Sequence, residues 1–352
     1  MKAAVYHHVQ DIRIQDVAEP ARPRAHEVLL DVLACGICGS DVSEWKHGPH
    51  FVPLSERHRA SGHLGPTILG HEFVGRVVQA GSAVTVLAVG DRVVSGAGVW
   101  CGTCSWCREG RTNLCEHWYV VGLSTHGALA ERVTVPAHIC VPVPPEMPDV
   151  TAAMAQPLAV ACHAVRRAGA QPGQRMAVIG VGGIGAFVTA AAADIGLSDL
   201  AAVDLDDERL RRAKELGATA VVNAASQNAD QQLHELTGGE GAHAVIEASG
   251  SPAGLELALR TVRRGGVVML VGLQPHPAAL DLHDLASREV SLLTSVSQIN
   301  DCDVPQALHL LSSGRLAQLV LDRVISLDQV VTHGLATLDA QHATGKIVVV
   351  PR

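Results

Sequence analysis

The first candidate for chemistry is the stretch Gly70-His71-Glu72-Phe73-Val74-Gly75, in which an imidazole and a carboxylate adjoin between two glycines. Cys38 lies upstream in a comparable glycine-containing stretch, Cys38-Gly39-Ser40-Asp41. Thiolate, imidazole and carboxylate groups are the donors that zinc takes in proteins. A His-Glu pair alone is more often an ordinary surface or core pair. The hypothesis that both stretches fold around one zinc ion therefore needs support from the rest of the chain.

A second candidate is a cluster of four cysteines with the spacing Cys101-x2-Cys104-x2-Cys107-x7-Cys115. Four cysteines this close can close a tetrahedral shell within one short loop. An all-cysteine shell has no open position and is typical of a structural zinc site. In a reducing compartment, clustered cysteines are expected to be metal ligands rather than disulfides.

A third candidate is the segment Gly180-Val181-Gly182-Gly183-Ile184-Gly185, which follows a predicted strand and begins a predicted helix. Gly180 permits the tight turn, Gly182 lets a pyrophosphate approach the backbone, and Gly185 permits close helix–strand packing. The free N–H groups of the helix then face the phosphates. The alternative is a Gly-rich turn that binds no ligand.

Asp204 ends the next predicted strand, where a carboxylate accepts hydrogen bonds from the adenosine ribose and repels a 2′-phosphate. This position favours NAD over NADP. Arg209 follows closely and lies either against the adenine or on a solvated helix face. Ser249 and the segment Val271-Gly272-Leu273 follow later strands, at whose carboxyl ends a bound nicotinamide should pass.

The elements that position these residues change in character along the chain. The N-terminal part is predicted to be β-rich, with a strand over 27–34 and a turn over 36–40 that places Cys38 at its tip. From 176 to 271, strands alternate with helices, which predicts a parallel sheet covered by helices on both faces. A last strand over 347–350 fits either part.

Composition sets the broad class. A length of 352 residues predicts about two domains, and 47% hydrophobic residues with only 3% aromatics fit an α/β protein. The net charge of −8 argues against a nucleic-acid partner. The sequence opens with no secretory leader and contains no stretch long enough to span a bilayer, so we expect a soluble, cytoplasmic protein with no membrane partner.

Taken together, these motifs resemble the zinc-dependent medium-chain dehydrogenases/reductases over nearly the full length of the chain. Within that family the sequence is most similar to the polyol branch of sorbitol, threonine and butanediol dehydrogenases. The segments that carry the resemblance are Cys38-Gly39-Ser40-Asp41, Gly70-His71-Glu72-x2-Gly75-x5-Gly81-x2-Val84, Gly90-Asp91-Arg92-Val93, the four-cysteine cluster, Gln156-Pro157-Leu158, and the Gly180–Gly185 segment.

The resemblance implies a two-domain α/β fold. A GroES-like β-rich catalytic domain would comprise residues 1–157 and 297–352, and a Rossmann domain with a doubly wound parallel sheet would comprise 158–296. It also implies two zinc ions per subunit, one catalytic and one structural, with NAD as the coenzyme. Relatives are homodimers or homotetramers, and we expect the same here.

For the catalytic zinc, the resemblance implies Cys38 and His71 as ligands, completed by a carboxylate. In polyol members this carboxylate is the Glu of the His-Glu pair or a Glu before Pro-Leu. Here the second position is Gln156, whose neutral amide oxygen is a weaker donor. Glu72 would then bind directly, or alternate with water and Gln156.

The implied chemistry is oxidation of a secondary alcohol, such as a small diol or polyol like 2,3-butanediol. Zinc lowers the pKa of the substrate hydroxyl, and Ser40 passes the proton outward. The carbon then delivers a hydride to the nicotinamide. Relatives continue the relay with a His where this chain has Ser43, which leaves the ribose, His47 or water for that role. Trp45 and Phe51 are candidates for an apolar pocket wall.

Three alternatives compete with this interpretation. An aldose dehydrogenase is favoured by Gln156, because some sugar dehydrogenases of the family carry Gln there. A non-catalytic zinc-binding interaction module would explain the cysteine cluster but not Cys38, His71, Asp204 or the glycine segment. A zinc-free reductase of the same superfamily should lack both Cys38 and the cysteine cluster.

Overall fold

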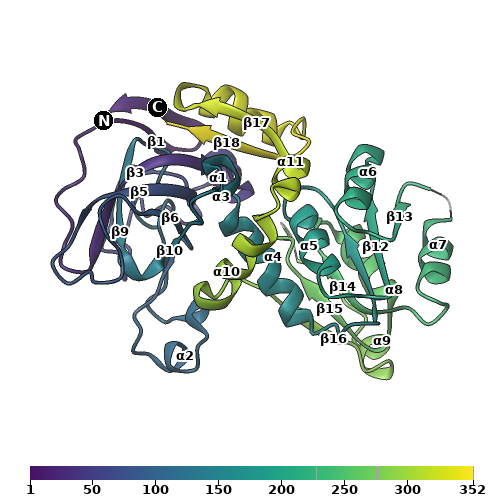
Figure 1. Ribbon diagram of the computed structural model, residues 1–352. Helices are drawn as coiled ribbons and strands as arrows, with labels where there is room; N and C mark the ends of the chain where they lie inside the picture. Colours follow the sequence, from purple (N-terminus) through teal and green to yellow (C-terminus); the bar gives the residue numbers. More distant parts are fainter. Residues whose placement is uncertain (227, 275–276, 352) are drawn as a thin grey trace. The chain divides into compact units, whose positions relative to one another are not determined.

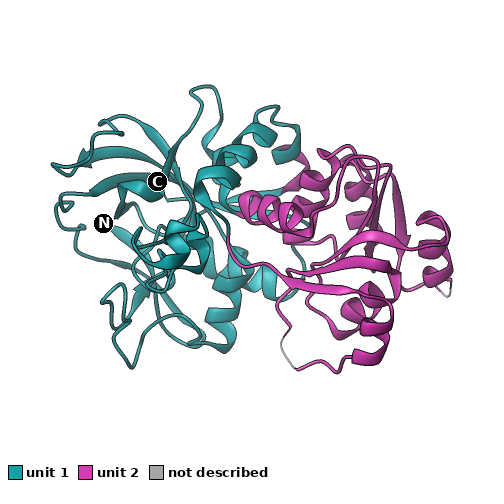
Figure 2. Ribbon diagram, turned by 90° about the horizontal axis from the view of Figure 1, so that it is seen from below, with its two compact units in different colours: residues 1–156, 298–317, 321–352 teal, residues 157–297, 318–320 magenta. Residues whose placement is uncertain are grey.

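The computed structural model describes residues 1–226, 228–274 and 277–351, and the chain forms two compact units (Figure 2). The first unit comprises residues 1–156, 298–317 and 321–352. The second unit comprises residues 157–297 and 318–320. The chain therefore leaves the first unit after residue 156, returns at residue 298, leaves it again for residues 318–320 and returns at residue 321.

The first unit is built mainly on antiparallel strands. Its largest sheet has seven strands in the order β10-β6-β5-β3-β18-β17, with β9 also pairing with β3. These strands are β3 (Glu27–Gly36), β5 (Glu72–Ala80), β6 (Arg92–Ser95), β9 (Arg132–Pro136), β10 (Cys140–Pro142), β17 (Leu321–Ser326) and β18 (Lys346–Val350). The strand near the C-terminus thus belongs to the first unit, where β18 pairs antiparallel with β3 and parallel with β17.

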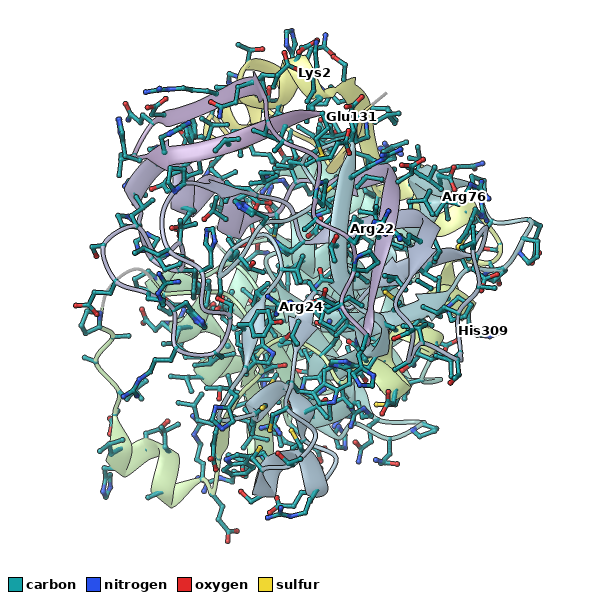
Figure 3. The ribbon with its side chains drawn as sticks, turned by 90° about the vertical axis from the view of Figure 1, so that its left-hand side faces the viewer. Lys2, Arg22, Arg24, Arg76, Glu131 and His309 are labelled. Carbon is teal, nitrogen blue, oxygen red and sulfur yellow. The ribbon has the colours of Figure 1, made fainter. Side chains whose placement is uncertain are left out.

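Two smaller sheets complete the strands of this unit. They contain β1 (Lys2–His8), β2 (Asp11–Asp16) and β4 (Thr67–Ile68), and the pair β7 (Gly98–Val99) with β8 (Tyr119–Val120). The backbone N–H of Lys2 donates to Oε2 of Glu131, which ties β1 to the segment before β9 (Figure 3).

The helices of this unit are short. They are α1 (Gly39–His47), α2 (Ser105–Arg108), α3 (Asp149–Ala152), α10 (Asn300–Leu311) and α12 (Ala336–Asp339), with 3-10 turns at Thr112–Leu114, Ala137–Ile139 and Leu327–Gln329 and a π-helical turn at Val330–Leu335. Two helices cross the boundary between the units, α4 (Ala155–Ala168) and α11 (Arg315–Val320).

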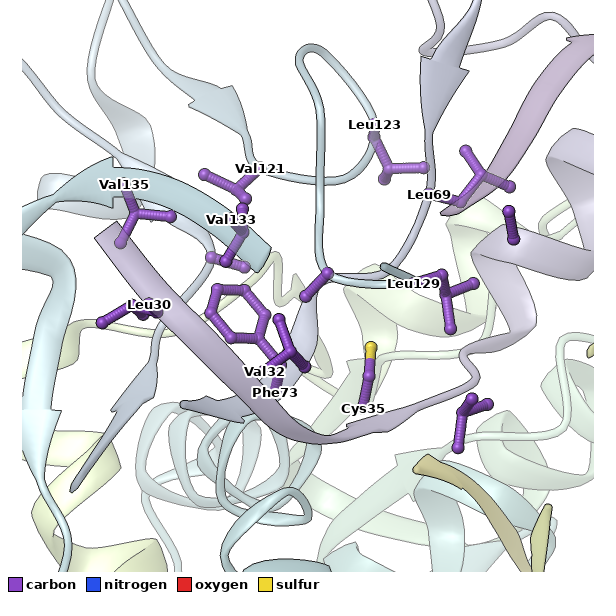
Figure 4. Close-up of a cluster of buried hydrophobic side chains, with 14 of the residues drawn as sticks. Leu30, Val32, Cys35, Leu69, Phe73, Val121, Leu123, Leu129, Val133 and Val135 are labelled. Carbon is purple, nitrogen blue, oxygen red and sulfur yellow. The ribbon is translucent and has the colours of Figure 1, made fainter. Parts of the chain in front are cut away.

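The core of the first unit forms around β3 and β5. Leu30 and Val32 of β3 and Phe73 of β5 are at most 3% exposed and lie in one cluster with Leu129 (Figure 4). Burying a side chain of this size favours folding by about 1.5–3 kcal/mol relative to leaving it exposed. This packing anchors the end of β3, two residues before Cys38, and the start of β5, which carries Glu72.

The second unit has a six-stranded sheet in the order β13-β12-β11-β14-β15-β16, with every neighbouring pair parallel (Figure 1). The strands are β11 (Arg175–Ile179), β12 (Asp199–Asp204), β13 (Ala220–Asn223), β14 (Ala242–Glu247), β15 (Val262–Leu270) and β16 (Ser291–Thr294). The connecting helices are α5 (Gly183–Ala193), α6 (Asp207–Glu215), α7 (Ala229–Leu236), α8 (Pro252–Thr261) and α9 (Leu282–Ser287). This strand order is that of the dinucleotide-binding Rossmann fold.

The predicted fold class, a GroES-like β-rich part plus a doubly wound parallel sheet, is confirmed. The turn expected over 36–40 is wrong in its second half, because α1 begins at Gly39 and Cys38 is its N-cap. In the second unit, helices α7 and α9 and the edge strand β16 were not predicted. Among the described residues, no helix is long and apolar enough to cross a membrane.

Candidate active site

Cys38 is positioned by the start of helix α1. The carboxylate of Asp41 accepts a hydrogen bond of 2.9 Å from the backbone N–H of Cys38, as a capping residue does in the first turn of a helix. Asp41 is fully buried, whereas Cys38 keeps part of its surface. The helix start therefore holds the thiol in place next to the end of β3.

His71 and Glu72 reach the same place from the start of β5. The register pairs Glu72 with Gly36 at the end of β3, and Gly36 precedes Cys38 by two residues. Gly70 has φ +95° and lies so close to Leu129 that an added Cβ would sit 2.7 Å from its backbone nitrogen. Only glycine suits this turn, and the turn delivers the histidine and the carboxylate to the end of the sheet.

One ligand atom each of Cys38, His71 and Glu72 can be chosen so that all lie within 4.8 Å of one another. His71 is 5% exposed and Glu72 is 1% exposed. A thiolate, an imidazole and a carboxylate that converge in a buried position fit zinc with three protein ligands and one open position. The donor chemistry of this cluster therefore suits a catalytic zinc ion.

The His71 ring has a polar neighbour at each nitrogen. Nε2 lies 3.3 Å from Oγ of Ser40, and Nδ1 lies 3.5 Å from Oδ1 of Asp41. Burial alone would lower the pKa of His71, but the charges of Asp41 and Cys38 raise it well above its usual value. Because a metal-bound imidazole is neutral, zinc and a proton compete for this ring.

Lys346 was missed by the sequence analysis. Its Nζ lies 2.6 Å from Oε1 and 2.5 Å from Oε2 of Glu72, and it donates to the backbone oxygen of Ile37 at 3.0 Å. Burial lowers the pKa of Lys346 and the Glu72 charge raises it, with a net increase. A lysine before an apolar run gives no local signal, since only the register of β18 brings it to the site.

Gln156 is the second residue of helix α4 and is 8% exposed. Its Nε2 donates to Oε1 of Gln298 at 3.2 Å. Gln298 was not predicted, because it lies 142 residues further along the chain in a segment with no motif.

Helix α1 also carries Glu44, a fully buried carboxylate. It accepts hydrogen bonds from the backbone N–H groups of His50, Phe51 and Val52, at 3.0, 3.1 and 3.0 Å. Glu44 follows Asp41 by three residues and so lies on the same helix face, one turn further from Cys38. Phe51, a candidate for the pocket wall, is 47% exposed on the segment that Glu44 holds.

The four cysteines at 101, 104, 107 and 115 form the second cluster in which the sulfur atoms lie within 4.8 Å of one another. Backbone N–H groups of Thr103 and Cys104 donate to the sulfur of Cys101 at 3.4 Å. Together with the Thr103 hydroxyl, which contributes most, they lower the pKa of Cys101 to about 5. Such N–H donors favour thiolates, so this lobe fits a closed structural zinc site.

In the second unit, the glycines of 180–185 have the geometry that a dinucleotide loop needs. Gly180 ends β11 with φ +81° and Gly182 is the N-cap of α5. A Cβ on Gly185 would collide with the backbone oxygen of Gly180, so this glycine allows the close helix–strand contact. Gly183 is exposed and Ile184 is half-buried in the first turn of α5.

Asp204 at the end of β12 is tied to this loop. Its Oδ2 accepts from the backbone N–H of Val181 at 2.8 Å, and its Oδ1 accepts from that of Leu205 at 2.8 Å. The guanidinium of Arg209 lies 3.8 Å from the same carboxylate. Asp204 and Arg209 thus both adjoin the glycine loop.

Ser249 and the segment 271–273 meet at the carboxyl ends of β14 and β15. The backbone oxygen of Glu247 accepts from the N–H groups of Val271 and Gly272 at 2.9 and 3.0 Å. The carboxylate of Glu247 is fully buried and accepts from the backbone N–H of Ser249 at 2.7 Å. Leu273 is 81% exposed. Glu247 was not predicted, although a buried acid at the end of a central strand calls for such donors.

Comparisons with known proteins agree with this architecture. A family model described as "Zinc-binding dehydrogenase" matches residues 183–313, and one described as "Alcohol dehydrogenase GroES-like domain" matches residues 24–145. Sorbitol dehydrogenase of Bacillus subtilis (strain 168) is 33% identical over 100% of this chain and 97% of its own length.

Solved structures of dehydrogenases match nearly the whole chain. The crystal structure of 2R,3R-butanediol dehydrogenase from Bacillus subtilis has a TM-score of 0.92 and 31% identity, covering 100% of this chain and 99% of its own. A chain from Sinorhizobium meliloti 1021, described as a zinc-binding dehydrogenase and bound to NADP, has a TM-score of 0.85 and 29% identity, covering 99% of each chain.

Proposed function

The chain belongs to the family of zinc-dependent alcohol and polyol dehydrogenases, and from that premise we propose that it oxidises a small diol or polyol, such as 2,3-butanediol, with NAD. The observation that carries the proposal is the convergence of Cys38, His71 and Glu72 within 4.8 Å. Relatives named for sorbitol and butanediol support the substrate class.

In this proposal Cys38 and His71 hold the catalytic zinc, with Glu72 and Gln156 available to complete its shell. The metal supplies Lewis acidity that lowers the pKa of a substrate hydroxyl, and the coenzyme accepts the hydride. Ser40 takes the hydroxyl proton at Oγ and releases its own toward solvent. Asp41 orients the His71 ring, and Lys346 offsets the charge of Glu72.

The coenzyme is proposed to bind the second unit, with Gly180–Gly185 at the pyrophosphate and Asp204 at the adenosine ribose. The charge of Asp204 supports NAD over NADP, because a 2′-phosphate would face a carboxylate. We propose residues 1–157 with 297–352 as the catalytic domain and 158–296 as the coenzyme domain.

The second candidate function is oxidation of an aldose, and the observation that favours it is Gln156. A neutral amide in place of a carboxylate leaves the site with one negative charge fewer. The two functions differ in substrate only, so one experiment separates them.

The test is a substrate panel of 2,3-butanediol, sorbitol, threonine and glucose with NAD and zinc present. We expect reduced nicotinamide with a diol or polyol, and none with the variant Cys38→Ser although it remains folded by circular dichroism. Turnover of glucose alone would favour the aldose function. No turnover on any member of the panel would refute the proposed substrate class.

We also propose a cytoplasmic homodimer or homotetramer with no nucleic-acid partner. Thiolate ligands such as the four-cysteine lobe persist in a reducing compartment. Strand β16 is last in the six-stranded order and its Ser291 and Thr294 are exposed, which supports pairing with a second copy. Light scattering that gave the mass of one chain at micromolar concentration would refute the assembly.

A further inference from the structure

Three buried side-chain amides form a chain of hydrogen bonds in the first unit. Gln156 donates from Nε2 to Oε1 of Gln298 at 3.2 Å. Gln298 donates from its own Nε2 to the backbone oxygen of Gly96 and, at 3.3 Å, to Oδ1 of Asn300. Asn300 donates from Nδ2 to the backbone oxygen of Ile139 at 3.2 Å. All three amide side chains belong to residues at most 8% exposed.

The groups at the two ends of this series of hydrogen bonds determine which amide atom donates and which accepts. The backbone oxygens of Gly96 and Ile139 can only accept hydrogen bonds. Asn300 must therefore turn its nitrogen to Ile139 and its oxygen to Gln298. Both N–H groups of Gln298 are then used, one on Gly96 and one on Asn300, so its oxygen faces Gln156.

An oxygen in that position requires a donor. The amide nitrogen of Gln156 supplies one, and a glutamate there would place one acceptor against another. Turning Gln298 around would not help, because its oxygen would then face the oxygens of Gly96 and Asn300. Glutamine at 156 therefore matches the direction of these hydrogen bonds, and an ionised glutamate opposes it.

We propose that Gln298 is a positioning residue that holds the Gln156 amide with its nitrogen turned to Gln298, so that position 156 offers a neutral oxygen to the zinc site. The link to zinc rests on the proposed function, whereas the hydrogen-bond polarity does not. With Gln156, the charges of Cys38 thiolate, Asp41 and Glu72 are balanced by Lys346 and a divalent ion. A glutamate would leave one uncompensated negative charge.

The direction of the Gln156–Gln298 hydrogen bond is tested by a double-mutant cycle of Gln156→Glu and Gln298→Met. Gln298→Met removes the acceptor oxygen at position 298 while keeping the side-chain length. Gln156→Glu alone should lower the Tm of the zinc-loaded protein by about 3 °C, and by less than about 1 °C in the presence of Gln298→Met. Gln231→Met, at an exposed glutamine of α7, controls for the substitution itself. An equal loss in both backgrounds overturns the positioning role.

A second comparison serves if Gln298→Met does not fold. Gln156→Met loses the donor without adding an acceptor, so it should be more stable than Gln156→Glu, although glutamate is closer in shape to glutamine. Measuring both with and without a chelator separates any stabilisation that a carboxylate gains from the metal. A Gln156→Glu protein as stable as the Gln156→Met protein in chelator overturns the proposal.

The role toward the metal is tested with Co²⁺ in place of the catalytic zinc. Gln298→Met should shift the visible absorption bands of the cobalt protein in the same direction as Gln156→Leu, because the first releases the Gln156 amide from its hydrogen bond and the second removes that amide. Bands unchanged by Gln298→Met, but moved by Gln156→Leu, overturn the link. Neither readout needs turnover, so a wild-type protein inactive on every substrate would refute the proposed function and leave this result standing.

Discussion

Glu72 has two possible partners, Lys346 and a zinc ion. Both of its carboxylate oxygens lie within 2.6 Å of Lys346 Nζ, and one of them also lies within 4.8 Å of ligand atoms of Cys38 and His71. A carboxylate held by a buried ammonium is already neutralised, which weakens its claim on a metal. Removing one partner of such a pair leaves an uncompensated buried charge and costs about 3–5 kcal/mol. Lys346 therefore decides how available Glu72 is to zinc.

We expect Lys346→Met to lower the free energy of unfolding of the first unit by about 3 kcal/mol in chelator, as measured by urea denaturation followed by tryptophan fluorescence, since all four tryptophans lie in that unit. Zinc should restore more stability to this variant than to the native protein, because Glu72 is then free to bind the metal. Adding Glu72→Gln should recover most of the loss in chelator, since the pair then leaves no unpaired buried charge. If the double variant is as unstable as Lys346→Met, the pair is not the cause.

Asp204 has a structural role in the glycine loop and a proposed role in coenzyme selection. Its carboxylate accepts from the backbone of Val181 and Leu205, and its charge is proposed to exclude a 2′-phosphate. Asp204→Asn removes the charge, keeps one of the two acceptor oxygens and puts an amide nitrogen in place of the other. We expect the ratio of kcat/KM for NADP to that for NAD to rise by about tenfold, roughly 1.4 kcal/mol. An unchanged ratio would mean that Asp204 does not face the ribose.

At this scale, the sequence identified residues that sit in compact motifs and missed their distant partners. Cys38, His71 and Glu72 stand out because glycines and neighbours mark them locally. Lys346 is 274 residues from Glu72, and its contact depends on the register of a strand pair. Register cannot be derived from a short apolar strand, because a slip of one residue would place the lysine on the opposite face.

Helix α1 joins the candidate site to the segment 50–52 through two buried acids, Asp41 near Cys38 and Glu44 one turn on. In Glu44→Gln, an amide N–H₂ replaces one acceptor oxygen and faces backbone donors. We expect KM for the alcohol substrate to rise about tenfold with kcat within twofold, because the segment bearing Phe51 loosens while the proposed zinc ligands stay. Glu56→Gln, at an exposed acid of the same loop, is the control. A fall in kcat alone would contradict this role.

Strand β4 carries a pH-sensitive contact. The backbone N–H of Ile68 donates to Nδ1 of His126 at 3.2 Å, which requires an unprotonated nitrogen. Burial, and then the neighbouring His63, lower the pKa of His126 to about 4, below the value of about 6.5 for an unfolded chain. The unfolded state therefore binds more protons, and stability is lost as pH falls from about 6.5 toward 4.

We expect the Tm of the native protein to fall over this pH range, and to fall less steeply in His126→Asn. Asparagine keeps an acceptor oxygen for Ile68 and does not titrate. The measurement is a series of thermal unfolding curves from pH 7 to 4. Parallel curves for the two proteins would show that His126 is not responsible.

Among the elements, the parallel sheet was predictable because its strands are aliphatic runs separated by helices of regular spacing. Strand β16 was not, because Ser291–Thr294 is short, with an exposed residue at each end, and so lacks the continuous apolar pattern of a buried strand. The start of α1 at Gly39 was also missed. Two glycines and a serine favour a turn locally. The hydrogen bond from the Cys38 N–H to the Asp41 carboxylate caps the first turn and stabilises a helix instead.

At the scale of the whole molecule, the two proposed ligands fall in different units. The zinc-ligand candidates, including the four-cysteine lobe, belong to residues 1–156, and the glycine segment with Asp204 belongs to 157–297. The lobe has little core of its own, since α2 contains no buried residue. Metal and coenzyme should therefore stabilise separate parts of the chain, and a single unfolding free energy does not describe the protein.

Removal of zinc by a chelator should expose the first unit to protease and spare the second. Peptides from residues 1–156 and 321–351 should be lost first in mass spectra, while a core spanning 157–297 persists. NAD at about a hundred times its Kd should add about 2.7 kcal/mol to the second unit alone. It should thus slow cleavage of that core without protecting the chelated first unit. Cys107→Ser should lower the bound zinc by one ion per chain and reproduce part of the chelator's effect. Simultaneous loss of both units on chelation, or protection of both by NAD, would mean that they unfold as one.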